Sequence, residues 1–183
     1  EKGSLVMYAL KEYLGEDTVN RVLREFLRAH RYETPPFVTS EALVKRFEAA
    51  APDSLKGFVG DLFREITFYD NRAVEATYTE TDDGRYRVEL TVEAHKQQAD
   101  SIGASPTSVP MNDVVEIGVF ATDADVDAEN QRTLYRTKRR LTGGKQTITV
   151  TVDEKPARAG VDPYTLLIDR ETEDNMTTVT RAD

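Results

Sequence analysis

The spacing of apolar residues changes along the chain and predicts helices first and strands afterwards. In the early part, apolar positions recur three and four residues apart, which is typical of a helix with one buried face. The clearest such stripe is formed by Val19, Val22, Leu23, Phe26 and Leu27. Similar stripes predict helices over residues 5–14, from Thr39 or Ser40 onward, and over residues 55–66. We interpret Gly57 and Gly60, three apart on the last helix, as points of close helix packing.

From residue 69 onward, apolar residues alternate with polar ones, which is typical of strands with one buried and one solvated face. The turn Asp82-Asp83-Gly84 predicts a hairpin between residues 74–79 and 85–94. Gly143-Gly144 predicts a second hairpin, between residues 134–141 and 146–152. Alternating stretches at residues 115–119 and 164–168 bring the number of short strands to about six or seven, which predicts an immunoglobulin-like β-sandwich.

We therefore expect an α+β protein made of two segregated parts. An N-terminal α-helical bundle segment is predicted over residues 1–68, followed by an antiparallel immunoglobulin-like β-sandwich over residues 69–183. The charge distribution supports a boundary at this point. Residues 1–68 hold 10 basic and 11 acidic side chains, whereas residues 69–183 hold 14 and 22.

The composition argues against several classes of function. A net charge of −9 disfavours non-specific binding of nucleic acid, so no nucleic-acid partner is expected. The absence of cysteine excludes disulfides, thiolate zinc sites and cysteine nucleophiles. No apolar run approaches the ~20 residues of a membrane-spanning helix, and no signal peptide is visible, so we expect a soluble fragment. The first residue is Glu1 rather than Met, which indicates a piece of a longer chain.

One acidic stretch resembles the start of a calcium-binding loop. It carries Asp123, Asp125 and Asp127, but the loop also needs Gly at its sixth position and Glu at its twelfth. Those positions hold Ala128 and Leu134, so we interpret the stretch as a solvated acidic loop and keep calcium binding as the alternative. A second oxygen-rich cluster, Asp169, Asp174 and Asn175, is interpreted as a turn held by its own side chains.

The basic and histidine side chains are interpreted as surface residues. His30 lies at a predicted helix C-terminus, and His95 shares the solvated face of a strand with Glu93. A basic cluster places Arg136, Lys138 and Arg140 on one strand face, which we interpret as solvated, with contact to an acidic neighbouring domain as the alternative. We therefore expect no catalytic residue and no metal ligand in this chain.

The first ten residues, EKGSLVMYAL, resemble a segment of the aminopeptidase N-like zinc metallopeptidases, the gluzincins. In that family a catalytic Tyr is followed by one residue, then Lys-Gly, then an apolar helix. Lys2 and Gly3 match this pattern, and the Tyr would fall immediately before Glu1. The family's HExxH motif, its third zinc ligand and its substrate-binding loop lie further upstream and have no counterpart here. The resemblance implies zinc in the full-length enzyme and no cofactor in this fragment.

Two further segments are similar to one bacterial branch of the family. Residues 66–72, ITFYDNR, resemble the passage into its β-domain, and the ending KPARAGVDPY, LIDR and Asp174-Asn175 resembles its C-terminal end. The peptidase of that branch is often joined to an ABC transporter permease-like membrane half. The resemblance therefore implies a parent attached to the bacterial inner membrane, on a side that it does not specify.

Two functions follow from these observations. The first is a non-catalytic C-terminal fragment of a zinc-dependent aminopeptidase that removes N-terminal residues from peptides. Its partner would be the upstream catalytic domain of the same polypeptide, whose cleft and domain packing it would support. We then expect an exposed apolar patch on the helical part, near Leu5, Met7 and Phe37, which meets the missing part or mediates self-association. The alternative is a stand-alone protein-interaction module with an immunoglobulin-like sandwich.

Overall fold

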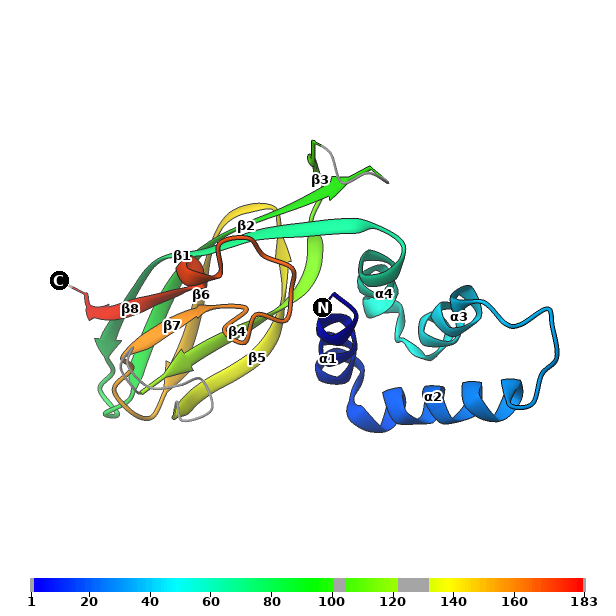
Figure 1. The fold of residues 1–183 in the computed structure, drawn as a ribbon. Helices are drawn as coiled ribbons and strands as arrows, with labels where there is room; N and C mark the ends of the chain where they lie inside the picture. The colour runs from blue at the N-terminus through cyan, green and yellow to red at the C-terminus, as the bar shows by residue number, and fades with distance from the viewer. Residues whose placement is uncertain (1, 101–104, 122–131, 183) are drawn as a thin grey trace. The chain divides into compact units, whose positions relative to one another are not determined.

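The computed structural model describes residues 2–100, 105–121 and 132–182 (Figure 1). The chain divides into two compact units, Glu1–Ile66 and Thr67–Asp183. The first unit is helical and the second is built from strands. Among the described residues, no helix has both the length and the hydropathy that a membrane crossing requires.

The helical unit consists of four α-helices and one short 3-10 helix. Gly15, with a φ of +87°, separates the first two helices in a conformation that other residues rarely adopt. The core of the unit contains Leu10, Phe47 and Val59, and the ring of Tyr13 stacks on Phe58 at 4.2 Å. The elements are α1 (Lys2–Leu14), α2 (Glu16–His30), α3 (Ser40–Ala50), the 3-10 helix Asp53–Leu55 and α4 (Lys56–Phe63).

The predicted helical bundle is wrong. The helices are short, and neighbours in the sequence pack on one another in succession rather than lining up as a bundle (Figure 1). Close packing at Gly57 and Gly60 is also wrong, because a Cβ atom built at either glycine meets nothing within 4 Å in the described structure. An apolar stripe predicts that a helix has a buried face, but it does not identify the element that covers that face.

An arginine at the end of α4 fastens this helix to α3. Nε of Arg64 donates to Oε1 of Glu48 at 2.6 Å, and its Nη1 donates to Oε2 of Glu41 at 3.1 Å. The hydrogen bonds to Glu48 and Glu41 raise the pKa of Arg64, and the same guanidinium lowers the pKa of Glu48. Because these groups are exposed to solvent, the contacts orient the two helices more than they stabilise them.

The second unit is a single curled sheet of eight strands (Figure 1). The strands follow the order β3-β2-β1-β8-β7-β4-β5, and β6 pairs with β2 as well. β1 and β8 run parallel, while the registers of β2–β3, β2–β6, β4–β5, β4–β7 and β7–β8 are antiparallel. The strands are β1 (Ile66–Glu80), β2 (Tyr86–Ala99), β3 (Thr107–Val109), β4 (Asn112–Phe120), β5 (Thr133–Thr142), β6 (Gly144–Val152), β7 (Arg158–Val161) and β8 (Met176–Arg181).

This architecture overturns the predicted immunoglobulin-like sandwich of two stacked sheets. The parallel β1–β8 pair, with Ala76 opposite Val179, joins the strands into one continuous sheet. A parallel pair links strands that are distant in sequence, and no local pattern signals it. The hydrophobic core includes Val88, Val92, Val115, Ile117, Leu141 and Leu166.

One of the two predicted hairpins is confirmed and the other is wrong. β1 and β2 are neighbours across the Asp82-Asp83-Gly84 turn, where Thr81 N–H donates to the Arg85 carbonyl at 2.8 Å. β5 and β6 do not pair with each other, since β5 pairs with β4 and β6 pairs with β2. A single residue, Gly143, separates them, and Gly144, with a φ of +97°, begins β6. The two glycines therefore make a corner rather than a hairpin turn.

Candidate functional site

The structure places the predicted site residues in different regions. Lys2 and Gly3 begin α1. Asp123, Asp125 and Asp127 lie outside the described residues, so calcium binding there stays untested. Within the described residues, no group of three or more His, Asp or Glu side chains is arranged to hold a metal ion.

Each of the two histidines lies within hydrogen-bond distance of a glutamate. His30 Nδ1 is 2.7 Å from Oε1 of Glu33, and the imidazole packs against Phe26. His95 Nε2 is 3.2 Å from Oε1 of Glu93, which also receives a hydrogen bond from Arg72 at 3.3 Å. The His95 hydrogen bond is the main reason why the pKa of Glu93 is lowered. His95 is exposed, which confirms its interpretation as a surface residue, and His30 ends α2 as predicted.

Two buried acidic residues of the second unit, Asp162 and Glu116, lie at a turn that follows β7. Asp162 is fully buried, and its carboxylate accepts hydrogen bonds from Leu166 N–H at 2.9 Å and Leu167 N–H at 3.0 Å. Burial raises the pKa of Asp162 to about 6, although the two hydrogen bonds oppose the rise. The residue also has a φ of +45°, which Asp tolerates better than most side chains. Residues 164–168, predicted to be a strand, form this turn instead.

An ion pair between a buried glutamate and an exposed arginine lies beside the turn. The Glu116 side chain on β4 is 2% exposed, and its Oε1 accepts a hydrogen bond from Arg136 Nε at 2.9 Å. The Arg136 guanidinium lies 4.4 Å from the centre of the Tyr164 ring. The carbonyl of Glu116 accepts from Asp162 N–H at 2.7 Å, which ties the pair to the turn. Arg136 is itself exposed, as its assignment to a solvated face predicts, but it also neutralises the buried Glu116 carboxylate.

The residues after the turn fasten β1 and β8 to it. Asp169 Oδ2 accepts from Asn71 N–H at 2.9 Å, and its Oδ1 accepts from Glu171 N–H at 3.1 Å. The second bond confirms the predicted turn held by its own side chain. Gly160 has no room for a side chain, because a Cβ there would overlap the carbonyl oxygen of Asn175. Partial burial is the main reason why the pKa of Asp169 is raised.

Sequence reasoning missed both Glu116 and Asp162. Glu116 stands between Val115 and Ile117, a charged residue in an otherwise apolar run, and this was the available signal. Asp162 precedes Pro163 in a dipeptide typical of turns, but nothing local shows that its carboxylate is buried. Both acids serve the fold, because their partners are backbone amides or Arg136.

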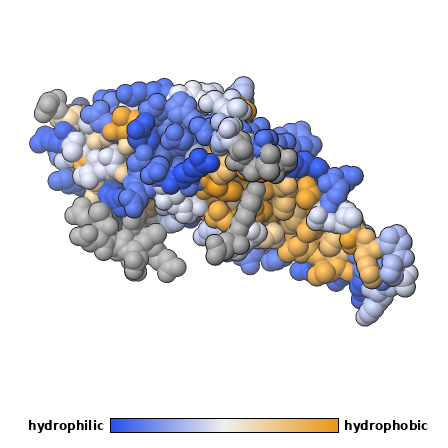
Figure 2. All heavy atoms as spheres, turned by 45° about the horizontal axis from the view of Figure 1, so that its top comes forward, coloured by the Kyte–Doolittle hydropathy of each residue, from blue (hydrophilic) through white to orange (hydrophobic). Residues whose placement is uncertain are grey.

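Two apolar grooves lie on the helical unit, whose surface shows gathered apolar residues in Figure 2. One, of about 430 Å³, lies between the start of α1 and the end of α4 and is lined by Gly3, Val6, Met7, Leu62 and Phe63. The other, of about 450 Å³, lies along the last two turns of α2. Leu5 and Met7 are half-buried, while Phe37 is 67% exposed.

Comparisons with known proteins do not identify the chain. No family model matches the sequence, and no curated protein matches it either. The described residues offer grooves and buried structural acids rather than a catalytic constellation, so the site best defined by the geometry is a packing or docking surface.

Proposed function

We propose that this chain is a non-catalytic C-terminal part of an aminopeptidase N-like zinc metallopeptidase, and that it supports the cleft of that enzyme. The observation that carries the proposal is the resemblance of two separated segments, EKGSLVMYAL at the start and AGVDPY with LIDR near the end. The resemblance also implies a parent attached to the bacterial inner membrane through a transporter-like half.

The groove between α1 and α4 supports the proposed role. It lies at the first turn of α1, beside Gly3, where the family pattern places the catalytic Tyr just upstream. Its lining is almost wholly apolar, and apolar surface of this kind is stabilised when another element covers it. In this proposal the upstream catalytic domain covers the groove, and α1 positions the end of the segment that carries the Tyr.

Zinc chemistry is not assigned to the described residues, because they contain no donor set that fits the metal. In the parent, the zinc ligands and the oxyanion-stabilising Tyr would all come from the upstream part. We therefore expect the purified fragment to bind no stoichiometric zinc and to release no amino acid from an N-terminal p-nitroanilide substrate. Metal analysis and the chromogenic assay check this, and turnover abolished by a chelator would contradict the proposal.

The decisive experiment is to sequence the coding DNA upstream of the Glu1 codon. A Tyr codon directly before it, with an HExxH motif and a downstream Glu further back, is the expected result. An in-frame start codon at that place with no such motif would overturn the proposal and favour a stand-alone interaction module.

A variant of the full-length protein tests the role of the groove. Met7→Glu places a charge in the apolar lining, so we expect loss of aminopeptidase activity through poor packing of the catalytic domain. Lys45→Glu, on the exposed surface of α3, is the matched control and should keep activity. Equal activity of both variants would show that the catalytic domain does not pack here.

A further inference from the structure

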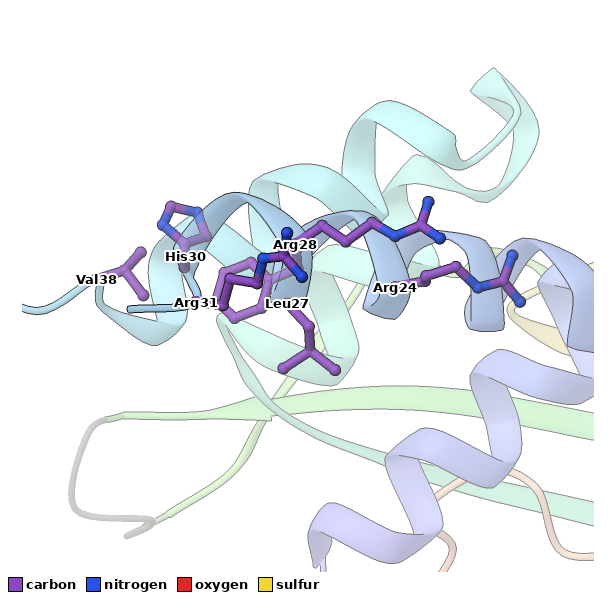
Figure 3. A pocket seen from close by; sticks show the side chains of 7 residues that line it. Arg24, Leu27, Arg28, His30, Arg31 and Val38 are labelled. Atoms are coloured by element: carbon purple, nitrogen blue, oxygen red, sulfur yellow. The ribbon is translucent and has the colours of Figure 1, made fainter. Parts of the chain in front are cut away.

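The second apolar groove, along the end of α2, has an apolar floor and a basic rim (Figure 3). Leu27 and Phe26 come from the helix, and Val38 comes from the segment that follows it. The Leu27 side chain is 66% exposed, although aliphatic side chains of this size are normally buried. Tyr32 and Phe37, which follow α2 in sequence, are 92% and 67% exposed. This end of the helical unit therefore presents apolar surface with no cover from the described residues.

The rim is formed by Arg24, Arg28 and Arg31, which are all exposed. Arg24 and Arg28 lie one turn apart on the same side of α2, and Arg31 follows the last helical residue as its C-cap. The acidic contacts of the basic residues of this helix are those of Arg21 with Glu25 and of His30 with Glu33, which follows the helix. Neither Arg24 nor Arg28 has an acidic partner among the described residues. Two neighbouring arginines without an acidic partner among the described residues stand out in a chain with a net charge of −9.

We propose that this groove binds an acidic amphipathic helix of a partner polypeptide. An apolar face of such a helix would cover Leu27, Phe26 and Val38, as in other helix-in-groove complexes. Acidic residues at positions i, i+4 and i+7 of the partner repeat the spacing of Arg24, Arg28 and Arg31, so a helix lying along α2 can place one carboxylate beside each guanidinium.

The shape of the site favours a polypeptide over a lipid surface. A groove of about 450 Å³ can enclose the apolar side chains of a partner helix, and a flat lipid surface would leave this recess unfilled. The proposal does not depend on the aminopeptidase assignment, because it uses only the groove and its arginines.

The experiment measures fluorescence anisotropy with a fluorescein-labelled acidic peptide of about 18 residues. Its leucines recur at i, i+3, i+4 and i+7, and glutamates flank them. A peptide of the same composition in shuffled order is the control for non-specific charge attraction. The Arg24→Glu/Arg28→Glu variant should bind the striped peptide at least tenfold more weakly, which corresponds to about 1.4 kcal/mol. Arg181→Glu, an exposed arginine on β8, is the matched control and should bind like the wild type.

Leu27→Ser keeps every charge and tests the apolar floor separately, and it should also weaken binding. Circular dichroism establishes that each variant is helical, and Leu27→Ser alone decides the matter if the double variant does not fold. Equal affinity for the striped and shuffled peptides would overturn the proposal, as would unchanged affinity in both groove variants. Sedimentation with phosphatidylserine–phosphatidylcholine vesicles tests the alternative that this surface binds a membrane. Vesicle binding without peptide binding would assign the surface to a membrane and overturn the proposal.

Discussion

Replacement of Asp162 by Asn tests the buried carboxylate of the turn after β7. Asp162 is fully buried, and burial raises its pKa from 3.8 to about 6. A carboxyl group whose pKa is higher in the folded state stabilises the fold while it is protonated. This contribution is complete below the unfolded-state pKa and is lost as the pH rises through 6. The difference between the two pKa values corresponds to about 3 kcal/mol over the whole titration.

Asp162→Asn removes the titration and keeps the size of the side chain. We therefore expect the free energy of unfolding of the wild type, relative to the variant, to fall by about 2 kcal/mol between pH 4 and pH 7. Urea unfolding followed by far-UV circular dichroism measures this difference, and Asp17→Asn at the exposed start of α2 controls for the loss of one negative charge.

The pKa of Asp162 can also be measured directly, by nuclear magnetic resonance of its carboxyl carbon. A midpoint near pH 6 is expected. A midpoint near 4, or unfolding curves for wild type and Asn variant that respond equally to pH, would refute the argument from burial.

Three further substitutions test the packing of the two units, two of them in the second unit and one at an open position of the first. Arg136→Met leaves the buried Glu116 carboxylate without its partner and should cost about 2 kcal/mol in urea unfolding, while adding Glu116→Gln should recover part of that loss. Gly160→Ala forces a Cβ atom onto the carbonyl of Asn175 and should cost about 2–3 kcal/mol, whereas Gly57→Ala meets open space on α4 and should stabilise it by about 0.5 kcal/mol. An unfolding midpoint for Gly160→Ala equal to that of the wild type would contradict the close approach of β7 to the segment before β8.

Local pattern predicted the helices well because each depends on its own neighbours in sequence. The stripe over Val19 to Leu27 lies within α2, and Gly15 ends α1 as expected. The last helix was predicted too long, since α4 ends at Phe63 and Ile66 already belongs to β1. Ile66 continues the helical spacing of apolar residues by coincidence, and the pattern alone could not show the change to a strand.

Strand pairing was predicted poorly because alternation identifies the buried face of a strand and not its partner. The Asp82-Asp83-Gly84 turn determines its own pairing, because the two strands follow each other directly. Gly143-Gly144 is an equally strong turn signal, but the strand that follows it, β6, pairs with β2 and not with β5. Nine residue pairs join β2 and β6, so the long register outweighs the local hairpin that the glycines would permit.

The C-terminal residues that carry the family resemblance have structural roles in the described fold. Gly160 allows β7 to approach the segment before β8, Asp162 caps the turn, and Asp169 fastens that turn to β1. These residues therefore determine the shape of one corner of the sheet. It follows that a side chain at Gly160 should lower the stability of the second unit, because it would disturb this corner.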